Sequence, residues 1–239
     1  HFCQPALPQA FAGCSILSTP AVAVSSTLNT AYAVIFACGS KVLALNGGTT
    51  FSTLWERDLC SFYTGTGTCR WSAGFGSPVL GRDGSTAFLC TGPNQQGACF
   101  ALRTADGSAA WANPFPSVTG GSNFHFTSSP ALTESGLLVV GSMVANKLIF
   151  INAADGSPSS EFTLGGKISS SPAVLADGSI CVCVQDGTLY KFTAAGSPDW
   201  QATGICYYSS DGTSRLQSSP AILPSGDIVV SAGDGYVRA

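Results

Sequence analysis

Five copies of a short motif, two small residues followed by Pro and an apolar residue, divide the sequence into units of similar length. The copies are Ser18-Thr19-Pro20-Ala21, Gly76-Ser77-Pro78-Val79, Ser128-Ser129-Pro130-Ala131, Ser170-Ser171-Pro172-Ala173 and Ser218-Ser219-Pro220-Ala221. Successive prolines are 58, 52, 42 and 48 residues apart, so the repeat is near 50 residues long with loops of variable length. A period of this size indicates an array of similar supersecondary units.

Each unit contains short apolar runs separated by turn dipeptides. In the fourth unit, Asp177-Gly178 and Asp186-Gly187 lie on either side of an apolar run, and Leu189 to Phe192 follows. Asp-Gly supplies the positive-φ residues of tight hairpin turns, and Pro suits the first position of a strand, where no ladder N–H is needed. We therefore expect four antiparallel strands per unit. The last strand carries an aromatic residue, which is Trp55, Trp111, Phe162 or Trp200.

Four short strands repeated about every 50 residues, with no 3.6-residue periodicity, predict an all-β fold: a β-propeller of about five four-stranded antiparallel blades. We expect residues 1–239 to form a single propeller domain with blades that start near residues 17, 75, 127, 169 and 217. The fifth unit stops at Ala239, part-way through its third strand, whereas residues 1–16 precede the first motif. Because a propeller must pair the edge of its last blade, we expect residues 1–16 to supply a closing strand and linker. The strand itself is expected within about residues 1–10, from the same molecule or from its neighbour.

The repeated phrase is Ser-Pro-Ala, then Asp-Gly-x-apolar-x-Val, then Asp-Gly-x-Leu-Tyr-x-Phe, then Gly and Trp, and it is strongest at residues 128–200. It resembles the repeat of pyrroloquinoline-quinone-type (quinoprotein-like) propellers. Quinone-binding members of that family are dehydrogenases, with a vicinal cysteine pair and an acidic calcium constellation. This sequence has five units and no adjacent cysteines. We therefore expect the repeat without the cofactor, without a metal and without dehydrogenase activity. The resemblance also suggests a scaffold like the propeller lipoprotein of bacterial outer-membrane assembly, although His1 is not a lipid-attachment cysteine.

Ten cysteines are unusual for a chain that works in a reducing compartment. Three pairs are close in sequence and flank short loops: Cys60 with Cys69, Cys90 with Cys99, and Cys3 with Cys14. Zinc ligation is the alternative to disulfides, but no Cys-x-x-Cys motif occurs and neither His lies in a cysteine cluster. Buried free thiols are a further alternative. We expect disulfides, and hence an extracellular or other oxidising compartment, secreted or at the cell surface.

Charge and hydropathy exclude several classes of partner. The net charge is -3, and the ten Lys and Arg residues are not clustered, so we expect neither nucleic acid nor an anionic membrane surface as a partner. Every apolar run is far shorter than the ~20 residues of a membrane span, so membrane insertion is not expected. No basic and apolar leader opens the sequence, so His1 is interpreted as a mature or trimmed start.

Catalytic residues are not apparent. Seven of the thirteen carboxylates belong to Asp-Gly turns, and the other six are scattered: Glu56, Asp58, Glu134, Glu161, Asp199 and Asp227. A propeller can bring distant carboxylates together at its axis, so a glycosidase remains an alternative. His125 is the only internal histidine, and we interpret it as a structural group. No nucleophile, phosphate-binding or zinc-protease motif occurs.

We therefore expect a non-catalytic extracellular structural or protein-interaction propeller. Its partners would be copies of itself, in an oligomer or filament built by strand sharing, or other extracellular proteins. The alternative is a carbohydrate- or ligand-binding, lectin-like propeller, in which Tyr63 and Tyr207 stack on the ligand from the linkers between blades. Packing between blades is the competing interpretation of these two residues. No N-glycosylation sequon is present, although the Ser/Thr-rich loops could accept O-linked sugars.

Overall fold

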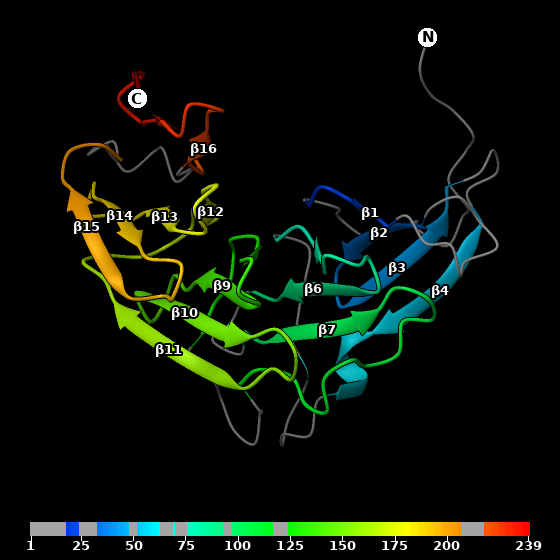
Figure 1. Ribbon diagram of the computed structural model, residues 1–239. Coiled ribbons are helices and arrows are strands. Elements are labelled where there is room, and N and C mark those ends of the chain that lie inside the picture. Colours follow the sequence, from blue (N-terminus) through cyan, green and yellow to red (C-terminus); the bar gives the residue numbers. More distant parts are fainter. Residues whose placement is uncertain are drawn as a thin grey trace, which may run out of the picture.

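A computed structural model of the chain describes residues 18–23, 33–47, 52–62, 69, 76–92, 97–116, 124–206 and 218–239. These residues form five antiparallel sheets, one from each sequence repeat, arranged in an arc around a common axis (Figure 1). We call the sheets blades 1 to 5 in chain order. The all-β propeller architecture predicted from the repeat is confirmed. The expected closing strand within residues 1–10 lies outside the described residues.

Each strand pairs with the next one along the chain, so the first strand of a blade lies nearest the axis and the last lies outermost. Blade 1 contains β1 (Ala21–Ala23), β2 (Ala33–Cys38), β3 (Lys41–Asn46) and β4 (Thr53–Asp58), followed by the 3-10 helix η2 (Leu59–Phe62). Blade 2 contains β5 (Val79–Leu80), β6 (Thr86–Cys90) and β7 (Cys99–Arg103). Blade 3 contains β8 (Ala131–Leu132), β9 (Leu137–Gly141), β10 (Lys147–Asn152) and β11 (Pro158–Thr163). Blade 4 contains β12 (Ala173–Val174), β13 (Ile180–Cys183), β14 (Leu189–Phe192) and β15 (Pro198–Ala202). Blade 5 contains β16 (Ala221–Ile222), β17 (Ile228–Ser231) and β18 (Val237–Arg238).

The Asp-Gly dipeptides form tight hairpin turns, but only their glycine has positive φ. In blade 4, the Gly178 N–H donates to the Leu175 carbonyl (2.9 Å), and Gly178 has a φ of 80°. The Asp177 carboxylate accepts the Ser179 N–H (2.9 Å), so this Asp stabilises the turn through its side chain. Within the described part of the chain, Asn146 is the one non-Gly residue with positive φ. The expectation that both residues of Asp-Gly have positive φ was therefore wrong.

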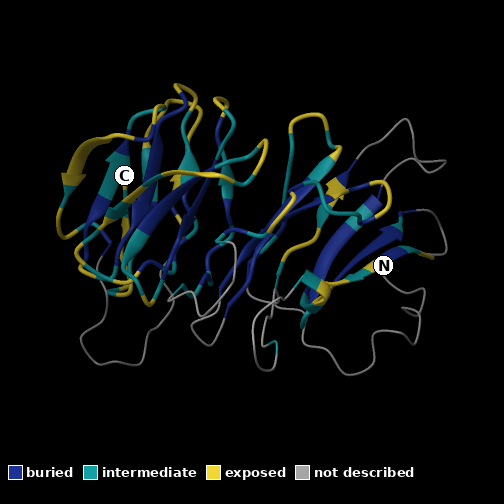
Figure 2. Ribbon diagram, turned by 90° about the horizontal axis from the view of Figure 1, so that it is seen from below, coloured by how far each residue is buried: buried dark blue, intermediate teal, exposed yellow. Residues whose placement is uncertain are grey.

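The core lies between the faces of neighbouring blades. Buried side chains of the middle strands form a separate cluster at each blade-to-blade contact, for example Ile35, Leu89 and Leu102 between blades 1 and 2. Figure 2 shows the buried residues concentrated along these strands and the exposed ones in the turns. Because each blade has two faces, every inner blade depends on both of its neighbours for burial.

Trp55 and Trp111 are each covered by a turn of the following blade. The Trp55 indole N–H donates to the Thr104 carbonyl (2.8 Å), and its ring lies so close to Gly107 that a Cβ there would be 2.6 Å from it. The Trp111 indole N–H likewise donates to the Ala153 carbonyl (2.9 Å), against Gly156. Glycine is required in these turns both for its positive φ and for this close approach.

Phe162 does not occupy the equivalent position in blade 3. Strand register places Trp200 opposite Lys191, and the corresponding residue opposite Phe150 is Ser160. Phe162, two residues further on, packs against Phe192 with ring centroids 5.2 Å apart. The β10 residue Phe150 fills the space over the glycine of the next turn, where a Cβ on Gly196 would be 3.1 Å from its ring. The expectation that Phe162 replaces the tryptophan was therefore wrong.

Candidate interaction edge

A belt of hydrogen bonds joins the blades next to the axis. The Thr19 N–H donates to Ser77 Oγ (2.9 Å), and the Ser77 N–H donates to Ser129 Oγ (2.8 Å). The Ser129 N–H then donates to Ser171 Oγ, and the Ser171 N–H to Ser219 Oγ, both at 2.9 Å. Each link uses the hydroxyl residue that precedes the proline of the repeated motif. Within the described residues the belt begins at Thr19 and ends at Ser219.

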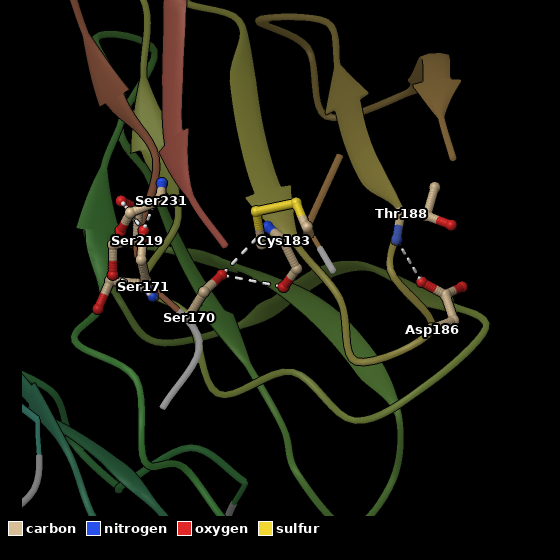
Figure 3. The surroundings of a disulfide bond; sticks show 9 residues. Ser170, Ser171, Cys183, Asp186, Thr188, Ser219 and Ser231 are labelled. Carbon is tan, nitrogen blue, oxygen red and sulfur yellow. Dashed lines mark hydrogen bonds between the residues drawn. A yellow bond between two sulfur atoms is a disulfide. The ribbon is translucent and has the colours of Figure 1, made fainter. Parts of the chain in front are cut away.

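The serine one position earlier binds within its own blade. Ser170 Oγ accepts the Cys183 N–H (3.1 Å) and donates to the Cys183 carbonyl (2.9 Å), as Figure 3 shows. Ser218 Oγ accepts the Ser231 N–H (3.2 Å) in the same way in blade 5. From the sequence, both hydroxyl residues of the motif were interpreted only as small residues. The signal that it missed is the hydroxyl residue before the proline in all five copies.

Three disulfides are present within the described residues. Cys60–Cys69 and Cys90–Cys99 are the pairs that the sequence spacing favours, with Cα atoms 5.7 and 4.0 Å apart. The third, Cys183–Cys206, joins β13 to the segment that leads out of blade 4. This pair was not predicted from the sequence. Cys3 and Cys14 lie outside the described residues.

Cys181 carries a free thiol in the core between blades 4 and 5. Burial raises the pKa of this thiol to about 12, so the thiol is protonated at pH 7. A protonated, buried thiol is a poor nucleophile and a poor metal ligand. Cys181 is therefore a packing residue.

The six carboxylates outside Asp-Gly turns all have local partners. Four of them form ion pairs: Glu56 with Lys41 (2.5 Å), Glu134 with Arg82 (2.6 Å), Glu161 with Lys147, and Asp199 with Lys191 (2.8 Å). The other two accept hydrogen bonds. Asp58 accepts the Cys60 N–H (3.0 Å), and Asp227 accepts the Ser225 hydroxyl (2.6 Å). Three of the ion pairs join the third and fourth strands of one blade, away from the axis. No cluster of three or more His, Cys, Asp or Glu residues that could hold a metal occurs in the described ranges.

His125 lies between blades 2 and 3. Its ring is so close to Gly92 that a Cβ there would be 2.7 Å from it, and its backbone N–H donates to Ser142 Oγ (3.4 Å). Burial lowers the pKa of His125, so the imidazole is neutral at pH 7. The other aromatic candidates, Tyr63 and Tyr207, lie outside the described residues.

Blade 5 has three strands among the described residues. Among the described residues β18 is the outermost strand of blade 5, whereas in blades 1, 3 and 4 the third strand pairs with a fourth. The side chains of Tyr236 and Val237 are 67% and 70% exposed. Tyr236 and Val237 therefore present apolar side-chain surface at this end of blade 5.

Trp200 extends this open site onto blade 4. Its side chain is 42% exposed, compared with 8% for Trp55 and 4% for Trp111. A groove of about 320 Å³ separates Trp200 from β18, with Leu189, Ile228 and Arg238 among its lining residues. The guanidinium of Arg238, the positively charged side chain among the lining residues, forms an ion pair with the Asp234 carboxylate (2.5 Å). We call the β18 edge and this groove together the blade 5 edge.

The radial order of the strands and the five-sheet arc define the chain as a β-propeller. A family model described as outer membrane protein assembly factor BamB matches residues 100–239. The chain belongs to this family of pyrroloquinoline-quinone-like repeats, as its repeated phrase predicted.

Solved structures agree with this assignment. BamB from Moraxella catarrhalis is 14% identical, with a TM-score of 0.61 over 92% of this chain and 60% of that one. Sqt1 from Saccharomyces cerevisiae is 11% identical, with a TM-score of 0.64 over 92% of this chain and 58% of that one. The WD40 propeller domain of Doa1 is 13% identical, with a TM-score of 0.55 over 86% and 59%. The chain thus spans about 60% of the length of the first two.

A search of curated protein sequences finds no significant match. Among the described residues, no helix has the length and hydropathy to cross a membrane.

Proposed function

We propose that this chain is a non-catalytic protein-interaction β-propeller that uses the blade 5 edge to assemble with other chains. The observation that carries the proposal is the apolar surface of blades 4 and 5, where the side chains of Trp200, Tyr236 and Val237 are exposed. Exposed aromatic and apolar side chains are common anchors for a protein partner. Copies of the same chain and other extracellular proteins are the partners that we favour.

The disulfides and the family support this proposal. Three disulfides among the described residues favour an extracellular or other oxidising compartment. The matching family is described as an outer membrane protein assembly factor, which is a role in interaction with other proteins. Only 10% of the residues are charged, which leaves few like-charge repulsions to oppose contact between copies.

The chemistry of the buried and acidic groups supports a role without catalysis. The scattered carboxylates are held by local lysine, arginine, backbone or hydroxyl partners. The Cys181 thiol is protonated at pH 7, and His125 is packed and neutral. Among the described residues, these groups do not form the adjacent acid and base that general acid–base catalysis requires.

The native mass of the particle over a dilution series tests the proposal. We expect oligomers that dissociate on dilution, and we expect Val237→Lys to shift the equilibrium to the monomer by placing a charge on the edge. Val144→Lys is the matched control, since Val144 is 42% exposed on a turn of blade 3. A chain that is monomeric at every concentration would contradict self-assembly. Glycan binding that is lost in Tyr63→Ala or Tyr207→Ala would instead support the lectin-like alternative.

A further inference from the structure

We propose that the groove between blades 3 and 4 binds an aromatic side chain of a partner protein, in the position that Phe62 fills between blades 1 and 2. This site lies on the other face of blade 4 from the blade 5 edge, and the inference does not depend on that edge. Among the described residues, Trp200 is the one that lines both grooves. Three features carry the inference: the equivalence of the two junctions, the difference in their filling and the chemistry of the open groove.

The walls of the two junctions are equivalent in strand register. Leu102 in blade 2 and Phe192 in blade 4 each lie opposite the residue two positions before the tryptophan of their blade. Two residues earlier on the same strands, Phe100 therefore corresponds to Tyr190. The third strands of blades 2 and 4 thus present the same two positions to the preceding blade.

The segments that follow the outer strands are equivalent as well. The Leu59 N–H donates to the carbonyl of Ser40, which directly precedes β3 (2.8 Å). The Leu164 N–H donates in the same way to the carbonyl of Asn146, which directly precedes β10 (2.8 Å). The 3-10 helix η2 of blade 1 therefore corresponds to residues 164–167 of blade 3. Figure 1 shows β11, which leads into this segment, as the outermost strand of blade 3.

An aromatic ring fills the groove at the first junction but not at the second. Phe62 of η2 packs against Phe100 with ring centroids 5.7 Å apart, and a space of only about 10 Å³ remains beside them. Residues 164–167 are Leu-Gly-Gly-Lys and bring no ring. A Cβ on Gly165 would be 1.9 Å from an Asp186 carboxylate oxygen, so this segment runs close against a turn of blade 4. A groove of about 340 Å³ is left between blades 3 and 4.

The side chains of the open groove are suited to a second ring. Phe162 of β11 and the β14 residues Tyr190 and Phe192 form aromatic walls. Phe162 has the register position of Arg57, since each lies opposite the second residue of the third strand. In blade 1 the Arg57 guanidinium lies over the Phe62 ring, 5.5 Å from its centroid. An aromatic wall replaces this cation in blade 3, and it favours an uncharged ring by offset or edge-to-face stacking.

The charges at the rim of the groove are already balanced. Lys191 pairs with Asp199 (2.8 Å), so the described lining residues carry no net charge. Thr163 and Gln201 add a hydroxyl and an amide that can bind the backbone beside an anchor. Aromatic anchors that fill such pockets provide much of the binding energy at protein interfaces. The groove therefore fits a phenylalanine-like anchor of a protein better than an ionic ligand.

The peptide acetyl-Asp-Leu-Ser-Ser-Phe-amide tests the groove, because it carries the sequence of residues 58–62 with serine in place of Cys60. It is titrated into the ¹⁵N-labelled full chain and followed by NMR. We expect millimolar binding, with amide shifts confined to Thr163, Leu164, β14 and Gln201. Replacement of the peptide phenylalanine by alanine should weaken binding by about tenfold, and this comparison needs no change in the chain.

An isosteric pair of variants in the chain provides the control. Gln201→Glu places a carboxylate on the wall of the open groove, where a bound ring would desolvate it, so we expect about fivefold weaker binding. Asn113→Asp is the matched control, because Asn113 lines the groove that Phe62 already fills, and binding should be unchanged. Both side chains are exposed, so neither change disturbs the core.

The outcomes separate this inference from the proposed function. Amide shifts outside the groove, or equal binding of the phenylalanine and alanine peptides, would overturn the inference. Shifts of the groove residues with methyl β-glucoside but not with the peptide would assign the groove to carbohydrate and overturn it as well. A groove that binds neither probe would overturn the inference but leave assembly through the blade 5 edge standing. A chain that is monomeric at every dilution but binds the peptide would overturn self-assembly and support this site.

Discussion

Blades 4 and 5 start from the same four residues, Ser-Ser-Pro-Ala, and differ in how completely they are buried. All four residues of β13 in blade 4 are buried, whereas in the equivalent β17 only Val230 is. The inner strands, the paired turns and the belt serine are the same in both blades. The motif therefore specifies the three inner strands of a blade. Burial of the second strand also requires the fourth strand of that blade and a neighbouring blade on each of its two faces.

The largest expected difference concerns the isoleucine that begins each second strand. Ile180 is fully buried, so Ile180→Ala should lower the free energy of unfolding by about 4 kcal/mol. Ile228, its equivalent in blade 5, is only partly buried, and Ile228→Ala should cost about 1 kcal/mol. Urea denaturation followed by circular dichroism measures both variants. Equal losses would show that blade 5 is as well packed as blade 4.

Removal of the Cys183–Cys206 disulfide should have the next largest effect. The bridge closes a loop with a sequence separation of 23, so the double change Cys183→Ala and Cys206→Ala should cost about 3 kcal/mol. Because Cys183 lies in the core between blades 4 and 5, we also expect faster hydrogen exchange in β17.

The control removes the Cys60–Cys69 bridge in the same way. This change should lower stability without altering the exchange of β17, because the bridge lies in blade 1. Faster exchange in β17 with both double variants would mean that the effect is not specific to the junction of blades 4 and 5.

A smaller difference is expected within the belt. Ser171→Ala removes the acceptor of the Ser129 N–H and should cost about 1 kcal/mol of unfolding free energy. Thr19→Ala should leave the stability almost unchanged, because Thr19 joins the belt through its backbone N–H, which alanine retains. Thermal melts of the two variants measure this difference. Equal destabilisation by both changes would contradict this account of the belt.

The smallest difference is expected from pH. In blades 3 and 4, the hydroxyls of Ser157 and Ser179, followed by their backbone N–H groups, lower the pKa of Asp155 and Asp177. The stability that these carboxylates contribute is therefore present above the unfolded pKa of about 4 and is lost as the pH falls through the lower folded pKa. We expect the melting temperature to fall between neutral pH and pH 3, and Asp177→Asn to reduce this fall. A melting temperature that rises on acidification would contradict this account.

The sequence predicted the fold well because its main signals are local. Pro at the start of a strand and Gly in a hairpin turn act on their immediate neighbours, so both could be interpreted without the structure. The belt could not be predicted in this way, because Ser129 and its acceptor on Ser171 are 42 residues apart. Phe162 was misplaced because the tryptophan position of blade 3 holds Ser160, and Phe162 is an aromatic residue two positions further along the same strand.

The candidate site was predicted less completely. The exposure of Trp200 was not predicted, because it depends on residues of the next blade and is not visible in its own strand. Cys183–Cys206 was missed because its two halves belong to a buried strand and to the segment that leaves blade 4, with no turn signal in common. The closing strand within residues 1–10 remains a prediction.

The axial belt has a consequence for how such a chain can change its size. Every link connects the same two atoms, a main-chain nitrogen and a side-chain hydroxyl, irrespective of which two blades meet. Duplication or deletion of one whole repeat therefore leaves each remaining junction chemically identical. Repeat number can vary during evolution without any new contact having to arise at the centre.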